Sequence, residues 1–264
     1  MSDYALRMSE VELARYRGMA AAAQELEADL WTSAGVVPGA HVIDLGCGPG
    51  AVLLALAERV GPTGAVIGVD TDAASVGVAE GLIAAAGLTN AQARVGHGTS
   101  TGLPAASADV VVMRHVLAHN QRIEQALVSH AASLVRPGGC VYLVDIDASL
   151  RRSRNAPAED RELWERYIAL HAVRGNDLQV GLRLPLLLAE AGLDVVIDTA
   201  VVAIVDSAPG LRPPSWAARE AMVEAGLADA DDVRRWGEAF DAADQATVRP
   251  RLFLPYFVAA GRRS

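Results

Sequence analysis

Residues 41–50 read HVIDLGCGPG, an apolar run that leads directly into three glycines within five positions. The run predicts a buried strand, and residues 51–60 predict a helix that ends before Gly61 and Pro62. A glycine turn between a strand and a helix lets a ligand approach the backbone closely, and the first amides of the helix are available to bind it. These residues therefore predict an α/β fold with a nucleoside-binding loop.

The same alternation of strand and helix continues along the chain. Residues 9–34 and 121–134 have helical spacing, and Asp72 is placed to cap a helix that runs to Gly87. Because the strands are continuously apolar and alternate with helices, they indicate a mostly parallel sheet covered on both faces. We therefore predict a Rossmann-like sheet of seven strands, at residues 41–45, 65–70, 91–95, 109–113, 141–145, 193–205 and 252–260.

The whole chain, residues 1–264, is predicted to form a single domain. A helical cap (1–35) precedes the nucleoside-binding core (36–147), two helical inserts follow at 148–192 and 207–248, and the last strands lie within 193–206 and 252–261. Since ligands of open α/β sheets bind beyond the carboxyl ends of the strands, we expect the inserts to build part of the binding site.

The composition excludes several classes of chemistry. The 264 residues carry 32 acidic and 23 basic side chains, which disfavours a surface for nucleic acid or an anionic membrane. Every basic residue is arginine, so a Schiff-base nucleophile, a pyridoxal-phosphate anchor and a lysine-dependent phosphate loop are excluded. The two cysteines have no metal-ligand spacing, and residues 1–10 lack a signal-peptide pattern. We expect a cytoplasmic protein without a metal or a membrane span.

Two acidic residues indicate which ligand the loop binds. Asp70 follows the second strand, 20 residues beyond Gly50, where a carboxylate can accept hydrogen bonds from ribose hydroxyls. Asp44 directly precedes the loop, where it would repel a pyrophosphate but could pair with an α-ammonium group. The loop also fits the dinucleotide fingerprint, which leaves an NAD-type oxidoreductase open, but Asp44 favours a nucleoside with an amino-acid tail.

Residues 43–50 resemble the first motif of the class I S-adenosylmethionine-dependent methyltransferases. The segment 102–111, GLPAASADVV, and the turn 136–139, RPGG, are similar to later motifs of the same family. The resemblance covers about residues 36–147 and, more weakly, 257–261. Within the class, the chain is similar to the branch that methylates small molecules, including the ubiquinone/menaquinone-type enzymes. The resemblance implies S-adenosylmethionine as the cofactor and a small-molecule acceptor.

The resemblance also implies a set of cofactor contacts. In similar enzymes the N-terminal helix packs over the cofactor, and the segment after the third strand binds adenine. His97 stands where the family commonly has an acidic residue for the adenine amine, and a neutral imidazole can still accept that bond. This departure keeps open a cofactor-binding protein that does not methylate. The predicted contacts are Tyr16, Asp44, Gly46, Cys47, Gly48, Gly50, Asp70, Thr71, His97, Gly98, Thr99 and Arg114.

Methyl transfer from a sulfonium is an in-line displacement that relies on alignment, and it needs a base only if the acceptor must lose a proton. By resemblance, the backbone of Arg114 lies near the amino-acid end of the cofactor, and His115 or His119 faces the acceptor. Histidine titrates close to neutrality, so both are candidate catalytic bases, with a structural role as the alternative. A scaffold that catalyses a rearrangement or cyclisation instead of methylation also stays open.

The inserts supply the candidate acceptor contacts Trp164, Tyr167 and His171, although for His171 an exposed helical position is the expected alternative. Aromatic side chains in both inserts suggest a flat or apolar acceptor, or else form the cores of the inserts; they are Trp164, Tyr167, Trp216, Trp236 and Phe240. Arg151, Arg152 and Arg154 could hold an anionic acceptor, but a solvated charge run is the simpler interpretation. The oligomeric state is left open, with a homodimer as one option.

Overall fold

The computed structural model describes residues 10–120 and 122–264. The predicted helix starts at Ser9 and Gln121 lie outside these residues. So do residues 1–9, which belong to the segment that we expected to lack a signal peptide. The first predicted helix is two helices, α1 (Glu10–Leu26) and α2 (Ala28–Ala34), because the chain bends at Glu27. The helix predicted to start at residue 121 is described as α5 (Glu124–Leu134).

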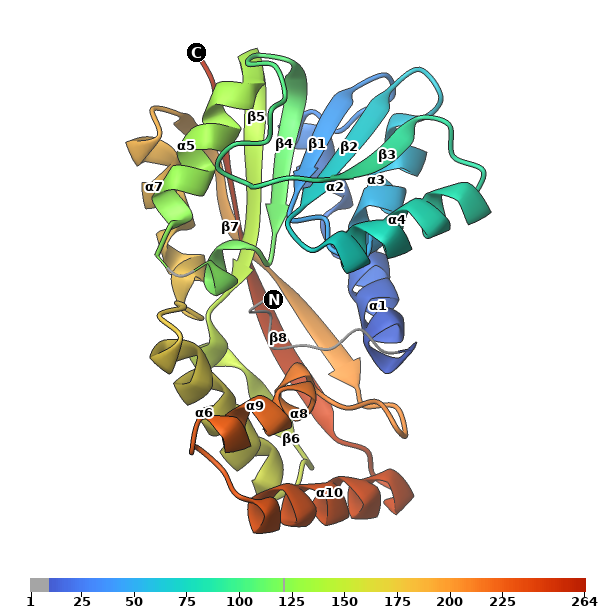
Figure 1. Cartoon of the computed structure of the whole chain (residues 1–264), viewed down its shortest axis with the longest axis vertical. Helices are drawn as coiled ribbons and strands as arrows, with labels where there is room; N and C mark the ends of the chain where they lie inside the picture. Colours follow the sequence, from blue (N-terminus) through green and yellow to red (C-terminus); the bar gives the residue numbers. More distant parts are fainter. Residues whose placement is uncertain (1–9, 121) are drawn as a thin grey trace.

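Five parallel strands form the first part of the sheet (Figure 1). Their spatial order is β3-β2-β1-β4-β5, with α3 (Ala51–Val60) and α4 (Ala73–Ala85) connecting β1 to β2 and β2 to β3. The chain order reverses between β1 and β4, which opens a crevice beyond the carboxyl ends of these two strands. The strands are β1 (His41–Leu45), β2 (Ala65–Asp70), β3 (Ala91–Val95), β4 (Ala108–Arg114) and β5 (Val135–Ile146).

Antiparallel strands complete the sheet. The last strand, β8 (Arg251–Arg262), pairs with β5 on one side and with β7 (Asp194–Asp206) on the other. Farther along, β8 also pairs with β6 (Arg152–Arg154), so the described residues form eight strands instead of the predicted seven. The prediction missed β6 because its three residues are all exposed and carry no apolar pattern.

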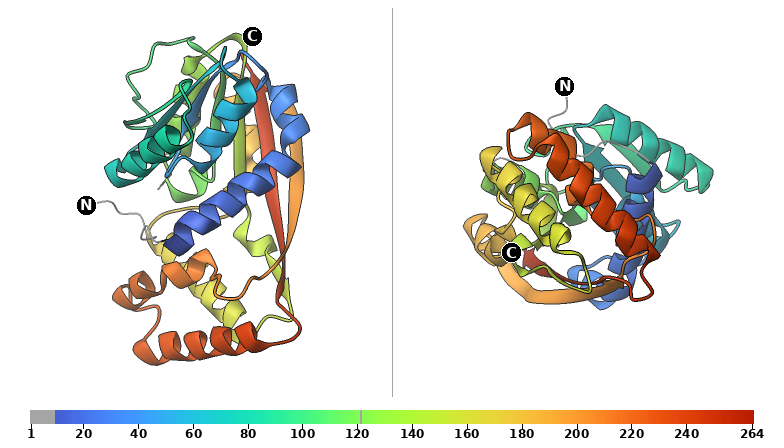
Figure 2. Two further views of the ribbon diagram at one scale, coloured as in Figure 1. Left: turned by 90° about the vertical axis from the view of Figure 1, so that its right-hand side faces the viewer. Right: turned by 90° about the horizontal axis from the view of Figure 1, so that it is seen from below.

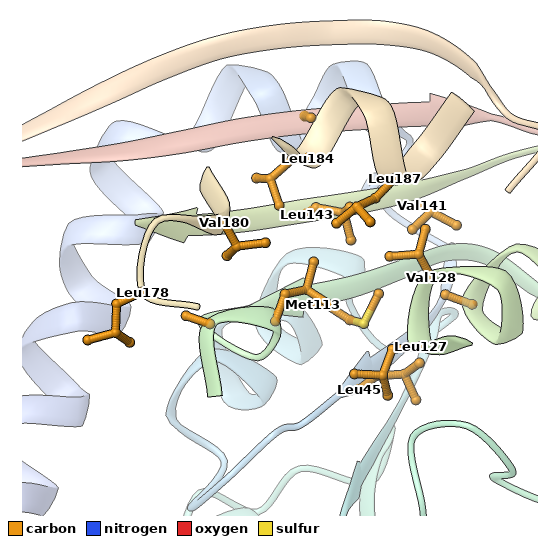
Figure 3. Close-up of a cluster of buried hydrophobic side chains, with 14 of the residues drawn as sticks. Leu45, Met113, Leu127, Val128, Val141, Leu143, Leu178, Val180, Leu184 and Leu187 are labelled. Atoms are coloured by element: carbon orange, nitrogen blue, oxygen red, sulfur yellow. The ribbon is translucent and has the colours of Figure 1, made fainter. Parts of the chain in front are cut away.

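Both faces of the parallel part of the sheet are covered, as its apolar strands predict, whereas most residues of β7 are exposed. Ile43 and Leu45 pack into a core with α5 and α7 (Leu184–Glu190), whereas Val42 points to the opposite face and packs with α3 and α4. This alternation follows from the two-residue period of a strand. Figure 3 shows the first core, in which side chains of β1, β4 and β5 meet those of α5, α7 and the short helix η3 (Val180–Arg183).

The remaining helices gather at the end of the sheet where the parallel strands finish, with α1 extending toward the same end (Figures 1 and 2). Two short helices, η1 (Leu117–His119) and η2 (Ala148–Leu150), follow β4 and β5 there. The other helices at this end are α6 (Ala158–Val173), α8 (Pro214–Ala217), α9 (Arg219–Glu224) and α10 (Ala230–Gln245). None of the helices described is long and apolar enough to cross a membrane.

Candidate active site

A cavity of about 1030 Å³ lies at the carboxyl ends of the parallel strands. Its wall runs from the glycine loop after β1, past η1, to α6 and the segment 211–214. Its volume is at the upper end of the range for small-molecule pockets, so it can hold a nucleoside and a second molecule together. The predicted site residues on this wall are Tyr16, Asp44, Gly46, Cys47, Gly48, Asp70, Thr71, His97, Gly98, Arg114, His115, His119, Trp164, Tyr167 and His171.

The glycine loop depends on backbone conformations that side chains rarely adopt. Gly46 has a φ of +78°, and a Cβ there would overlap the side chain of Val116. Gly48 has a φ of +51° and lines the cavity with open space around it. The structure places Gly50 off the cavity wall, because it caps α3 and a Cβ on it would lie 2.7 Å from Cβ of Ala79. Gly50 therefore supports the conformation of the loop without lining the cavity.

Asp70 ties the loop to the end of β2. Its Oδ2 accepts a hydrogen bond from the Gly48 amide at 2.8 Å, and its Oδ1 accepts one from the Asp72 amide at 2.9 Å. Each carboxylate oxygen can accept a second hydrogen bond, so Asp70 can still bind ribose hydroxyls from the cavity wall. The predicted cap is confirmed, since Asp72 accepts from the Ser75 amide at the start of α4.

Asp44 is a buried carboxyl group directly beneath the loop. Only 2% of the residue is exposed, and its Oδ2 has no hydrogen-bond partner among the residues described. Burial, and next the negative charge of Asp70, raises the pKa of Asp44 to about 7, while Arg114 acts to lower it. A buried acceptor with no partner is costly, so this position suits a cationic ligand group such as an α-ammonium.

We expect Asp44→Asn to change how stability depends on pH. The unfolded chain releases this proton near pH 4, whereas the folded chain holds it until about pH 7. Ionisation of Asp44 therefore removes stability between pH 4 and pH 7, by at most about 4 kcal/mol. The free energy of unfolding of Asp44→Asn, relative to wild type, should rise across this window in urea titrations. A constant difference would show that Asp44 is ionised in the folded, ligand-free protein.

The segment after β3 forms the other end of the predicted cofactor site. His97 is exposed at the edge of the cavity, and its Nδ1 lies 2.8 Å from the hydroxyl of Thr99. Thr99 itself is not on the wall, so it orients the imidazole and does not face the cavity. Gly98 is on the wall, packed against Leu127, and a Cβ there would lie 2.6 Å from that side chain.

A buried ionic network behind the site was missed by the sequence analysis. Glu27 is fully buried at the bend between α1 and α2, and it accepts hydrogen bonds from Arg114 Nε (3.1 Å), Tyr142 Oη (3.1 Å) and Trp31 Nε1 (3.3 Å). The helical spacing of the sequence gave one sign of this burial, because Glu27 lies four residues after Ala23 and four residues before Trp31, which are both buried. The network fixes the helical cap to the end of β4.

His115 follows β4 in a strained backbone conformation, with a φ of +57°. Its amide donates to the Val144 carbonyl, and its Nδ1 lies 3.8 Å from Oδ1 of Asp145. Burial, followed by the charge of Arg114, lowers the pKa of His115. Burial also lowers the pKa of the neighbouring His119 to about 4. Both imidazoles are therefore neutral at pH 7 and able to accept a proton.

Asp145 ends β5 and is held in place by the backbone. Its Oδ2 accepts from the Ala118 amide at 3.1 Å, and its Oδ1 accepts from the Ile146 amide at 3.0 Å. It is 1% exposed and lies on the cavity wall. A carboxylate fixed in this way favours the tautomer of His115 that carries its proton on Nδ1.

The side chains of α6 form an aromatic wall. Trp164, Tyr167 and His171 lie in sequence along the cavity, with ring centroids 5.3 Å and 4.5 Å apart, and His119 is 4.9 Å from His171. The expectation of an exposed His171 is wrong: the residue is 3% exposed, because the helices at this end cover it. Burial lowers the pKa of His171 to about 3.

The other insert residues divide between the cavity and the core. Phe240 of α10 lines the cavity, with Trp216 against its edge at 5.8 Å, whereas Trp236 is fully buried in the core beside α6. Arg152 and Arg154 are exposed, as expected of a solvated charge run. Arg151 departs from that expectation, because it is paired with Asp160 on the cavity wall.

Known proteins share both the sequence motifs and the fold. Residues 37–180 match the family model described as a methyltransferase domain. Nocamycin O-methyltransferase of Saccharothrix syringae is 39% identical over 40% of this chain, and aklanonic acid methyltransferase DauC of a Streptomyces species is 38% identical over 29%. The matched segments cover 38% and 34% of those two relatives.

The solved structure of YcgJ from Bacillus subtilis has the same fold. It superposes with a TM-score of 0.58, at 18% identity, over 95% of this chain and 98% of that one. This likeness concerns the fold, while the family follows from the sequence match. Because the family model covers more than half of the residues, this chain belongs to the methyltransferase-domain family.

Proposed function

We propose that this protein transfers a methyl group from S-adenosylmethionine to a small-molecule acceptor by in-line displacement. The observation that carries the proposal is the cavity, which joins the glycine loop and Asp44, whose Oδ2 has no partner among the described residues, to two neutral buried histidines. Such an arrangement can hold a donor and an acceptor side by side, which is the main requirement of the reaction. The methyltransferase relatives named for nocamycin and aklanonic acid support a small-molecule acceptor.

The residues present fit the cofactor. The carboxylate of Asp44 would pair with the α-ammonium of the methionine part, Asp70 would accept from the ribose hydroxyls, and His97 and Gly98 would face adenine. The bound cofactor supplies the electrophilic methyl group. The chain therefore has to bind, align and, where the acceptor carries a proton, remove that proton.

We propose His115 as the base that takes this proton. The nearby charge of Asp145 favours the tautomer with the proton on Nδ1, which leaves the lone pair on Nε2, and Nε2 has no hydrogen-bond partner in the described part of the chain. His119, whose pKa burial lowers to about 4, is the alternative base.

The test is incubation with S-adenosylmethionine labelled in its methyl group and a metabolite extract. We expect label in a small-molecule product. Binding of the cofactor without any transfer would instead favour a cofactor-binding protein or a scaffold with a non-methylating reaction. No binding of S-adenosylmethionine, together with binding of NADH, would favour an oxidoreductase and contradict the proposal.

Asp70→Ala should weaken cofactor binding by about 1–3 kcal/mol, because hydrogen bonds to the ribose are lost. Calorimetric titration with S-adenosylhomocysteine measures this change. Since Asp70 also holds the Gly48 amide, Asp70→Asn serves as the matched variant that keeps one acceptor oxygen for the loop. Unchanged affinity in Asp70→Ala would show that Asp70 does not bind the ribose.

A further inference from the structure

Four arginines on the cavity wall are paired with carboxylates of the chain. Arg151 lies beside Trp164 of the aromatic wall, and both of its terminal nitrogens donate to Asp160, at 2.9 and 2.8 Å. The two side chains are 7% and 5% exposed, and the guanidinium lies 4.8 Å from the ring of Trp164. This is a bidentate, nearly buried ion pair, the strongest kind of side-chain hydrogen bonding.

The other arginines on the wall are also engaged within the chain. Arg212 and Arg249 share Asp244, at 2.8 and 3.1 Å, and Arg212 also binds Asp241 at 2.7 Å. Arg114 is paired with Glu27. Arg15 donates to the sulfur of Met19 and lies over the ring of Tyr16, both on α1, and Arg174 also has an interaction within the chain.

An anionic group beside the aromatic wall would therefore have to compete with Asp160 for Arg151. The displaced carboxylate of Asp160 would stay buried without its arginine, which is unfavourable. The chain has no lysine that could take the place of an arginine. Arg151 is thus not available to bind an anion.

His171 adds a neutral hydrogen-bond donor to the same wall. Its Nδ1 lies 3.0 Å from the amide nitrogen of Asn176 and accepts that hydrogen, so the proton of the neutral ring is on Nε2. This buried Nε2 has no partner among the described residues. An oxygen of a bound molecule is the acceptor that this group lacks.

Building on the methyl-transfer function above, we propose that the acceptor is a flat molecule whose part beside the aromatic wall carries no anionic group. It would lie against Trp164 and Tyr167 and present an oxygen to Nε2 of His171. Arg151, Arg212 and Arg249 then act as clamps that hold the wall together, and they do not bind substrate.

Prodan is a suitable probe, because it is an uncharged naphthalene ketone whose emission shifts when its carbonyl accepts a hydrogen bond. It is titrated into the protein with S-adenosylhomocysteine, beside analogues that carry a carboxymethyl or a trimethylammonioethyl group. Prodan should bind, and the carboxymethyl analogue should bind at least about tenfold more weakly, while the trimethylammonioethyl analogue controls for the added size. A lack of saturable prodan binding, or equal binding of the carboxymethyl analogue, would overturn the proposal. Binding of S-adenosylhomocysteine is recorded separately, so a failure of the proposed function is seen independently.

Two variants test whether Arg151 and His171 have the roles proposed for them. Asp160→Asn releases Arg151, so the carboxymethyl analogue should gain about tenfold in affinity while the trimethylammonioethyl analogue does not. His171→Phe keeps a ring but removes the donor, so bound prodan should lose the hydrogen-bond shift in its emission. His171→Gln, which keeps a donor, should restore the shift, and His41→Phe, an exposed site outside the cavity, is the matched control.

Thermal unfolding shows whether each variant is folded. An unchanged emission shift in His171→Phe, or no gain for the carboxymethyl analogue in Asp160→Asn, would contradict the assigned contacts.

Discussion

We expect His115→Asn to reduce the rate of methyl transfer by about 10²–10⁴-fold, the usual contribution of a positioned general base. Asparagine is chosen because it tolerates the left-handed backbone conformation at this position, where φ is +57°. The loss should appear in kcat, because the lone pair on Nε2 acts only on the proton that leaves the acceptor. The rate is measured in single turnovers with the product identified by label transfer.

The matched comparison is His119→Asn, four residues farther along. His119 lies on the same cavity wall, with its ring 4.9 Å from the ring of His171. Affinity for S-adenosylhomocysteine should be unchanged in both variants. A large loss in His119→Asn together with full activity in His115→Asn would reverse the assignment. Full activity in both would mean that the acceptor needs no base.

Glu27→Ala should lower the free energy of unfolding by about 3–5 kcal/mol, the cost of removing one partner of a buried ion pair. Arg114 would remain 9% exposed without its carboxylate, and the hydroxyl of Tyr142 would lose its acceptor. Urea titration, followed by far-ultraviolet circular dichroism, measures this loss. Because Arg114 is a predicted cofactor contact on the cavity wall, we also expect weaker cofactor binding.

Two variants act as controls for the network. Glu27→Gln keeps the shape and one acceptor oxygen, so it should cost less than the alanine variant. Glu25→Ala removes an exposed carboxylate from the same helix and should change stability by no more than about 0.5 kcal/mol. If Glu27→Ala were as mild as Glu25→Ala, the network would not hold the helical cap to the sheet.

The glycine loop and the strands around it could be read from the sequence because their signals are local. Gly46 and Gly48 adopt positive φ, and a continuously apolar run such as 141–144 indicates a strand buried on both faces. The strand β6 carried no such signal, because three exposed residues beside β8 gain their structure from pairing alone.

The sequence by itself determined the α/β fold, the family resemblance, and the placement of Asp44 and Asp70 around the loop. These features depend on periodicity and on spacing within one strand–loop–helix unit. The tertiary structure alone decided that Glu27 is buried against Arg114, that Arg151 is neutralised by Asp160, and that His171 lies inside the cavity. The physical reason is that the charge and burial of a side chain are set by partners distant in sequence, and Glu27 meets its partners 87 and 115 residues away.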